Sequence, residues 1–361
     1  MNYQPVDWPA ADPSSPYFCH GPTLISFSGG RTSAYMLYQV LRAHGGMLPD
    51  YVLVVFANTG KEAPETLRFV YECGLRWNVK IWWVEWRARV GAIEDRFETV
   101  SFDSASRNGE PLAALFKART YLPNAVTRFC TADGKIQAMK WFMLSRGFSN
   151  WTNMVGLRAD ERPRLIKIVL NNLAKRERWT SSCPLALAGV TKRHVHRFWL
   201  GRNAHGRDRR YPLPQGFDLG LLDHEGNCDN CFLKGFMVLA HHERAKPGTL
   251  DWWIEQEDAV TAMIEAGETA DKPSGARFIT EHTYRQIRDY AHSSAELPGL
   301  DEIDTTTECG VACAVGGAEE EVDDAAFAWL IDQLRKAAAT PLVMPDARKA
   351  APATVGDLFD D

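Results

Sequence analysis

The sequence TLISFSGGRTS at residues 23–33 places a short apolar run directly before a turn rich in glycine and hydroxyl side chains. Apolar residues then recur at helical spacing from 34 to 41, so the stretch predicts a strand, a tight loop and a helix. Glycine lets a backbone approach an anion closely, and the first amide groups of a helix have no partner within it. We therefore expect a phosphate-binding loop. Its candidate residues are Ser26, Ser28, Gly29, Gly30, Arg31, Thr32 and Ser33.

The segments that follow this loop predict an α/β fold. Near-continuous apolar runs are typical of buried parallel strands, and here they alternate with stretches of helical periodicity. This alternation favours a parallel sheet flanked by helices, which binds ligands at the carboxyl ends of its strands. The expected strands are 23–27, 51–57, 79–86 and 152–157, and the expected helices between them are 33–44, 62–73 and 131–145. The polar stretch 88–125 is expected to be a loop-rich insertion.

Three segments that follow expected strands carry the motifs SGG at 28–30, FANTGKEAPET at 56–66 and GLRADE at 156–161. In this order they resemble the PP-loop superfamily, whose fold is that of the adenine nucleotide alpha hydrolases, and within it the phosphoadenosine-phosphosulfate reductase-like branch. Thr32 stands where the signature of the superfamily has an aspartate. The resemblance implies that the loop binds ATP with Mg²⁺, and that Asn58, Thr59 and Arg158 also contact the nucleotide.

A pair of cysteines in the sequence CDNC, Cys228 and Cys231, has the spacing of a metal site. Taken alone, the pair could also be redox-active or bind zinc. Iron–sulfur sulfonucleotide reductases, in the same branch, carry a Cys-Cys pair near the position of Cys130 and a later C-x-x-C, whereas this sequence has only one cysteine at the position of the pair. The resemblance therefore implies an iron–sulfur cluster, most simply [4Fe–4S], held by Cys130, Cys228 and Cys231. Cys183 is the candidate fourth ligand, and without it one iron would be open to sulfur.

Charged residues near the expected site suit the cleavage of ATP, which needs positive charge on the departing pyrophosphate. Arg158 and Arg164 could make bidentate contacts to phosphate, and Lys135 could act as a point charge on the same anion. Asp160 and Glu161 could hold magnesium or orient Arg158. The leading hypothesis is an ATP pyrophosphatase of sulfur metabolism. It would form an adenylate on an acceptor, either a nucleic acid or a small molecule, for sulfur transfer from the cluster.

Two other functions stay open. The sequence TECG at 307–310 is similar to the catalytic segment of sulfonucleotide reductases, so Cys309 would be the nucleophile of a reductase acting on adenylyl sulfate or its 3′-phosphorylated form. Ala312 replaces the histidine of that segment, and Cys313 follows. The third hypothesis is a nucleotide- or redox-sensing module without turnover. The sulfur or electron donor and the oligomeric state are not indicated by the sequence.

The bulk composition indicates a soluble globular protein. The 361 residues carry a net charge of −5, with 45% apolar and 24% charged residues, so no overall positive charge points to nucleic acid. No apolar run is long enough to span a bilayer or to form a signal peptide, and a cytoplasmic location with reduced cysteines is expected. The expected parts are an irregular arm at 1–21, a nucleotide-binding domain at 22–236, a helical extension at 237–300 and an acidic, partly disordered tail at 301–361 that contains a helix at about 324–338.

Overall fold

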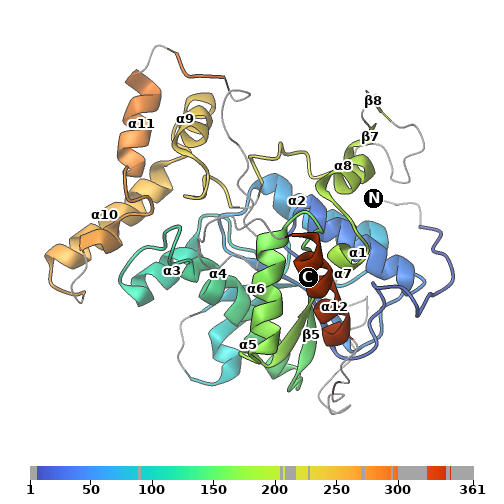
Figure 1. Ribbon diagram of the computed structural model, residues 1–361. Coiled ribbons are helices and arrows are strands. Elements are labelled where there is room, and N and C mark those ends of the chain that lie inside the picture. The colour runs from blue at the N-terminus through green and yellow to red at the C-terminus, as the bar shows by residue number, and fades with distance from the viewer. Residues whose placement is uncertain are drawn as a thin grey trace.

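The sheet at the centre of the computed structural model is an α/β arrangement of six strands (Figure 1). The structure describes residues 6–87, 91–203, 206–207, 217–226, 228–269, 273–293, 296–299, 323–338 and 342. The strands run in the order β4-β3-β2-β1-β5-β6, and only the edge strand β4 is antiparallel to its neighbour. Their bounds are β1 Thr23–Ser26, β2 Val52–Asn58, β3 Ile81–Trp86, β4 Phe97–Val100, β5 Trp151–Val155 and β6 Trp179–Ser182.

Helices cover both faces of this sheet because the side chains of its central strands are apolar on both faces. Val54 and Phe56 of β2 pack in one apolar cluster, and their neighbours Val55 and Ala57 pack in the other. The first cluster includes residues of the helices α1 Arg31–Ala43, α2 Pro64–Trp77 and α8 Lys192–Leu200. The second includes residues of α3 Glu110–Arg119 and α5 Ala138–Ser145. The predicted α/β sheet with flanking helices is thus confirmed.

A third apolar cluster lies beside the edge strand β6, where the last described helix packs. Leu330 and Leu334 of α12 Asp324–Ala338 belong to one apolar cluster with Leu165 and Ile168 of α6 Arg162–Leu173, and α12 contacts both α6 and the short helix α7 Pro184–Leu187. The helix expected at about 324–338 is therefore present. Most of the rest of the expected tail, including Cys309 and Cys313, lies outside the described residues. A two-stranded ribbon, β7 Arg202–Asn203 and β8 Gly206–Arg207, follows α8.

The expected insertion at 88–125 is more ordered than its polar sequence predicts. It holds the short helix η1 Ile93–Arg96, the strand β4 and the helix α3.

The helix expected at 131–145 is a composite. A single turn α4 Phe129–Thr131 leads into a π-helix, η2 Ala132–Gln137, and then into α5. Single π-turns are rare and often lie at functional sites, and this one begins two residues after Cys130.

The helical extension packs against the second face through Trp253, Leu239 and Ile287. It consists of α9 Phe236–Ala245, α10 Asp251–Glu265, the short helix η3 Pro273–Ala276 and α11 Tyr284–Ser293, and it lies to one side of the sheet (Figure 1). None of the helices in the described ranges is long and apolar enough to cross a membrane.

A buried carboxyl in this extension predicts a pH-dependent stability. Glu257 is 5% exposed and accepts the backbone amide of Tyr284 at 2.9 Å, and burial raises its pKa from 4.5 to about 7. Between these two values the native state keeps a proton that the unfolded chain has released, so stability falls as pH rises through this window, by at most about 3 kcal/mol. In urea titrations at pH 5 and pH 8, Glu257→Gln should remove this loss. Asp289→Asn, at an exposed position of α11, should leave it; an unchanged slope in Glu257→Gln would contradict the assignment.

Candidate functional site

The loop between β1 and α1 has the geometry of an anion-binding turn. Gly29 adopts φ +76°, and a Cβ atom there would lie 2.7 Å from Thr66 and 2.9 Å from Val70 of α2, so only glycine fits. Helix α1 begins immediately afterwards at Arg31, and its N-cap, Gly30, offers no side chain to the first amide groups. These groups are the ones that bind anions at helix N-termini.

The hydroxyl groups of this loop bind one another. The Ser33 side chain donates to the carbonyl of Gly30 at 2.9 Å and accepts both the amide of Ser28 at 3.2 Å and its hydroxyl at 3.0 Å. Ser33 thereby fixes the curvature of the loop. Ser26 is different, because its hydroxyl donates to Asn153 of β5 at 2.6 Å inside the sheet. Ser26 was predicted to bind nucleotide, but its hydroxyl instead links strands β1 and β5.

The segment after β5 closes over the start of α1. Gly156 lies so near α1 that a Cβ atom there would be 3.2 Å from the Cα atom of Ser33. Two residues later, the guanidinium of Arg158 donates to the hydroxyl of Thr32 at 3.2 Å and to the carboxylate of Asp160 at 3.0 Å. Thr32, a neutral side chain, is therefore the partner of a cation on the opposite loop.

Glu161 organises the same segment. Its carboxylate accepts the backbone amide of Arg158 at 2.9 Å and the guanidinium of Arg164. Asp160 similarly accepts the amide of Lys192, the first residue of α8, at 3.1 Å. Of the two roles left open for Asp160 and Glu161, the geometry fits the orientation of arginine, since both carboxylates are already paired with cations or amides.

Arg31 is held by a loop that sequence reasoning missed. Its guanidinium makes two hydrogen bonds to Asp218, at 2.9 and 2.8 Å, and one to the carbonyl of Leu221 at 2.7 Å. The carbonyl of Arg31 accepts the indole of Trp199 at 2.8 Å. Asp218 is 187 residues from Arg31, so the sequence carries no local signal of this pairing.

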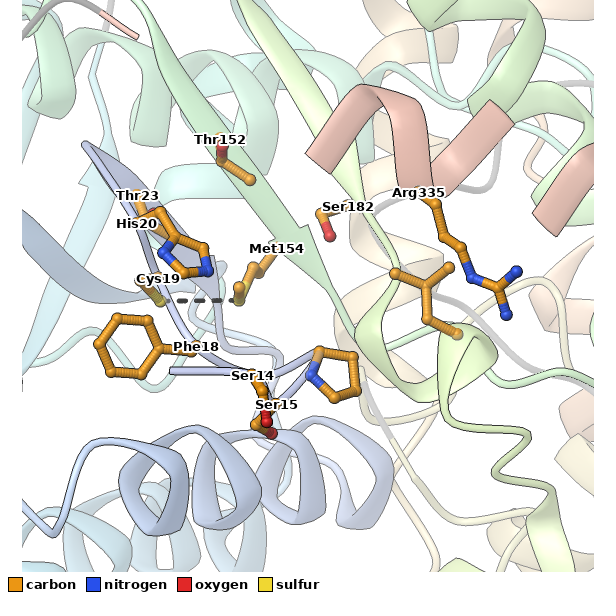
Figure 2. A pocket seen from close by; sticks show the side chains of 12 residues that line it. Ser14, Ser15, Phe18, Cys19, His20, Thr23, Thr152, Met154, Ser182 and Arg335 are labelled. Carbon is orange, nitrogen blue, oxygen red and sulfur yellow. Dashed lines mark hydrogen bonds between the residues drawn. The ribbon is translucent and has the colours of Figure 1, made fainter. Parts of the chain in front are cut away.

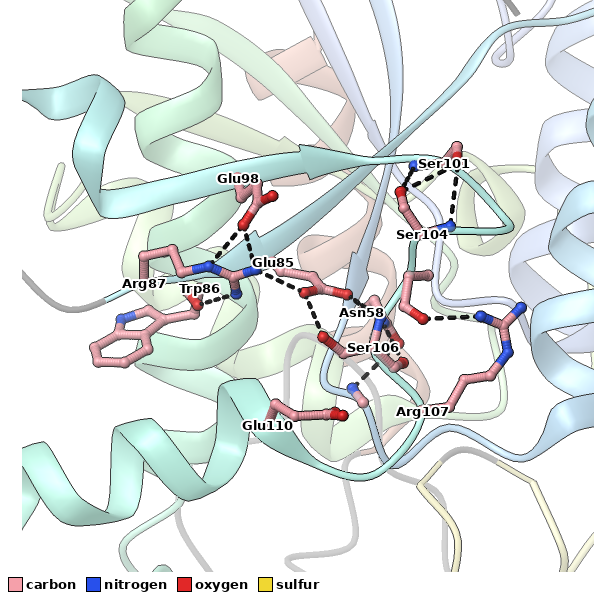
Figure 3. A network of polar contacts seen from close by, with 12 residues as sticks. Asn58, Glu85, Trp86, Arg87, Glu98, Ser101, Ser104, Ser106, Arg107 and Glu110 are labelled. Atoms are coloured by element: carbon pink, nitrogen blue, oxygen red, sulfur yellow. Dashed lines mark hydrogen bonds and ion pairs between the residues drawn. The ribbon is translucent and has the colours of Figure 1, made fainter. Parts of the chain in front are cut away.

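Asn58, predicted to contact the nucleotide, belongs to a buried polar network (Figure 3). Its amide donates to Glu85 of β3 at 2.7 Å and to the carbonyl of Ser106 at 2.9 Å, and its oxygen accepts the amide of Gly60. Ser106 also donates its amide and its hydroxyl to Glu85, each at 2.7 Å. Because the Asn58 side chain is fully engaged, its contribution is to shape the loop after β2.

A second group of predicted residues lines one cavity beside this loop. Thr59, Lys135, Cys130, Cys228 and Cys231 all face it, together with the apolar walls formed by Leu112, Phe116, Phe232 and Trp253. The C-x-x-C turn reaches this point through backbone contacts with residues 61 and 62, which pair with it as an isolated antiparallel bridge. The structure thus brings together three of the four cysteines predicted as metal ligands.

The fourth predicted ligand, Cys183, lies elsewhere. It is fully buried at the start of α7, in the apolar cluster with Val155 and Leu165, and burial raises the pKa of its thiol. The other three cysteines pack in a different apolar cluster from Cys183. Within the described ranges, no three His, Cys, Asp or Glu side chains stand preassembled around a common metal position.

The helical extension supports the C-x-x-C turn, a connection that the sequence did not indicate. The hydroxyl of Tyr284 donates to the carbonyl of Asn230, between the two cysteines, at 2.8 Å. The Asn230 amide donates to the hydroxyl of Thr249 at 2.7 Å, and its oxygen contacts His242 Nδ1 at 2.9 Å. Burial lowers the pKa of His242 to about 4, so this imidazole is neutral at physiological pH.

A second cavity lies away from both groups (Figure 2). It is bordered by the N-terminal segment, by Thr23 and Thr152 of β1 and β5, by Ser182 at the end of β6, and by Arg335 of α12. The Cys19 thiol approaches the Met154 sulfur at 3.9 Å on its wall. Its lining shares no residue with the loop between β1 and α1 or with the cysteine cavity.

The site is therefore that of an α/β protein with a glycine loop at the carboxyl edge of its sheet. No family model matches the chain, and no solved structure gives a significant match. The chain is 28% identical over 217 residues to an uncharacterized nin region protein, ORF290, of Escherichia phage lambda. The match covers 58% of this chain and 66% of the phage protein, just under two thirds of that relative.

Proposed function

We propose that this chain is an adenine-nucleotide-binding enzyme of the PP-loop type, related to the phosphoadenosine-phosphosulfate reductase-like branch, that cleaves ATP between its α and β phosphates. One observation carries the proposal. The loops after β1, β2 and β5 meet at one edge of the sheet, and β1 lies between β2 and β5. The chain order reverses at β1, and nucleotides bind α/β sheets at such a switch point.

The described residues would divide the work of cleavage. The amide groups at the start of α1 would bind phosphate oxygens, since Gly29 and Gly30 leave them accessible. Arg158, 5% exposed and oriented by Asp160 and Glu161, would neutralise charge on the departing pyrophosphate. An acceptor oxygen would attack the α-phosphorus, the bond to the bridging oxygen would break, and pyrophosphate would leave. A sulfur nucleophile would then displace AMP.

Magnesium does not fit the carboxylates proposed for it. Asp160 pairs with Arg158 and the amide of Lys192, and Glu161 pairs with Arg158 and Arg164. A cation at this point would face the arginines that these groups already hold. We therefore assign no step to Mg²⁺ bound by this chain, and Mg²⁺ would enter only as the complex with ATP.

The cysteine cavity fits a metal–thiolate centre. Thiolate is the ligand of both iron–sulfur clusters and structural zinc, and apolar walls limit access of water to three cysteines there. Lys135 and Arg128 line the same cavity and would offset the negative charge of thiolates. When bound, an iron–sulfur centre would supply the sulfur chemistry of the second step. Cys130, Cys228 and Cys231 would hold it. Lys135, which pairs with Glu62 at 2.9 Å, would act at this centre rather than on the phosphates of the nucleotide.

The proposal is tested by incubating anaerobically purified protein with Mg·ATP and measuring pyrophosphate and AMP. Arg158→Ala should lower the rate at least about 100-fold, whereas Arg193→Ala, exposed on α8, should leave it unchanged. Reduction of a sulfonucleotide without pyrophosphate release would instead support the reductase, and tight ATP binding without turnover would support a sensor. Either result would overturn ATP cleavage. If pyrophosphate is released, the acceptor of the adenylate would be sought among nucleic acids and small molecules.

A further inference from the structure

Glu62 is a buried carboxylate whose hydrogen bonds are incomplete. Its side chain is 0% exposed, and its Oε1 atom accepts Lys135 Nζ at 2.9 Å and the hydroxyl of Thr59 at 3.1 Å. Within the described part of the chain, its Oε2 atom has no hydrogen-bond partner. A buried carboxylate oxygen without a partner is costly, and a bound ion is one of the few features that explain such an atom.

Glu62 and Cys228 lie at a distance that two ligands of one ion would also have. The Cys228 thiol donates a hydrogen bond to Glu62 Oε1 at 3.7 Å, and Oε2 of the same carboxylate is the atom without a hydrogen-bond partner among the described residues. A sulfur about 2.3 Å and an oxygen about 2.1 Å from the same tetrahedral ion would be roughly 3.6 Å apart. The backbone holds the two residues in this relation, because Glu62 and Cys228 form a bridge and the amide of Asp229 donates to the carbonyl of Lys61 at 2.6 Å.

We propose that Glu62 is a metal ligand, and that it binds a single divalent ion, zinc or iron, together with Cys228, Cys231 and Cys130. This inference rests on the proposed metal centre and changes its form: a single ion carries no cluster sulfide, so the sulfur for the second step of the proposed reaction would come from a separate donor. In a four-iron cluster each iron takes one protein ligand, so Glu62 and Cys228 would bind different irons and stand further apart. A donor set of three sulfurs and one oxygen also makes Cys183 unnecessary as a ligand. Since no three such ligands are preassembled among the described residues, metal binding should order the cavity.

The test uses the full chain, purified anaerobically and loaded with Zn²⁺ or, as a spectroscopic probe, Co²⁺. The wild-type protein should hold one metal per chain and no acid-labile sulfide. Glu62→Gln should weaken Zn²⁺ binding at least tenfold in competition with a chelator. Glu65→Gln, three residues away and exposed on α2, should not change it. Glu62→Cys should restore binding and raise the intensity of the sulfur-to-cobalt charge-transfer band by about a third, since thiolates rise from three to four.

Several outcomes would overturn this inference. One is four irons and four sulfides per chain that are retained in Glu62→Gln, and another is unchanged Zn²⁺ affinity in that variant. The inference would also be overturned if the wild-type protein bound no metal. Should Glu62→Gln fold poorly, as judged by circular dichroism, the cobalt spectrum of Glu62→Cys decides alone. Nucleotide binding and pyrophosphate release are measured separately, so ATP cleavage can fail while the metal ligand stands, and the reverse.

Discussion

Gly29→Ala is expected to lower the free energy of unfolding by about 2 to 4 kcal/mol and to weaken ATP binding more than tenfold. About 1 kcal/mol comes from placing a side chain at φ +76°. The rest, about 1 to 3 kcal/mol, comes from contacts of 2.7 and 2.9 Å with Thr66 and Val70 of α2. The loop must shift to relieve them, and its amides then leave the positions that suit phosphate. Urea denaturation and isothermal titration with ATP measure the two effects.

Gly189→Ala is the matched control. Gly189 has φ +66°, but a Cβ atom there would meet nothing within 4 Å. The variant should lose only about 1 kcal/mol, for the backbone conformation, and should bind ATP normally. If both variants lost the same stability, the packing of the loop against α2 would not constrain Gly29. If Gly29→Ala bound ATP as tightly as wild type, the loop would not be the phosphate site.

Glu85→Ala is expected to destabilise the protein by about 3 to 5 kcal/mol. The carboxylate is fully buried and accepts four hydrogen bonds, from Asn58, from the amide and hydroxyl of Ser106, and from Arg87. Its removal leaves those donors buried without partners, which costs more than the bonds contributed. Freed from Glu85, Asn58 no longer fixes the loop that leads to Glu62, so metal affinity should fall as well. Denaturation curves and Zn²⁺ titration test both.

Glu98→Ala serves as the comparison, because Glu98 also pairs with Arg87 but is 55% exposed. Screened surface pairs contribute at most about 1 kcal/mol, so this variant should be close to wild type in stability and in metal affinity. Similar losses in both variants would mean that Arg87, and not the buried network, accounts for the effect. Glu85→Gln, which keeps one acceptor oxygen, should fall between Glu85→Ala and wild type.

The sequence predicted the sheet because its central strands are continuous apolar runs. The run at 51–57 corresponds to β2 Val52–Asn58, and the strands expected at 79–86 and 152–157 correspond to β3 and β5. Strand β4 escaped prediction because it is a four-residue edge strand without a buried residue. Strand β6 is equally short and was not identified either, because period and length carry little information in strands of four residues. The 12-residue helix α6 that precedes it was also not identified, although its length is ordinary.

The candidate site was predictable only where its residues are neighbours in the chain. The loop at 28–33 and the pair Cys228 and Cys231 stand out by local pattern. The contact of Glu62 with Cys228 joins residues 166 apart, and no local pattern encodes it. Likewise, the guanidinium of Arg158 and its carboxylate partners were visible in the sequence as charges, but which carboxylate orients which cation depends on how the loop after β5 folds over α1.

The backbone bridge between Glu62 and Cys228 would couple the binding of nucleotide to the binding of metal. Residues 58–62 leave the strand whose end borders the loop that we propose to bind nucleotide, and the same residues fix the first cysteine of the C-x-x-C turn. Any displacement of this segment by one ligand alters the free energy of binding the other. Thermodynamic reciprocity then requires that the factor by which ATP changes metal affinity equals the factor by which metal changes ATP affinity. Nucleotide affinities measured on metal-depleted protein would differ from those of the replete protein by that factor.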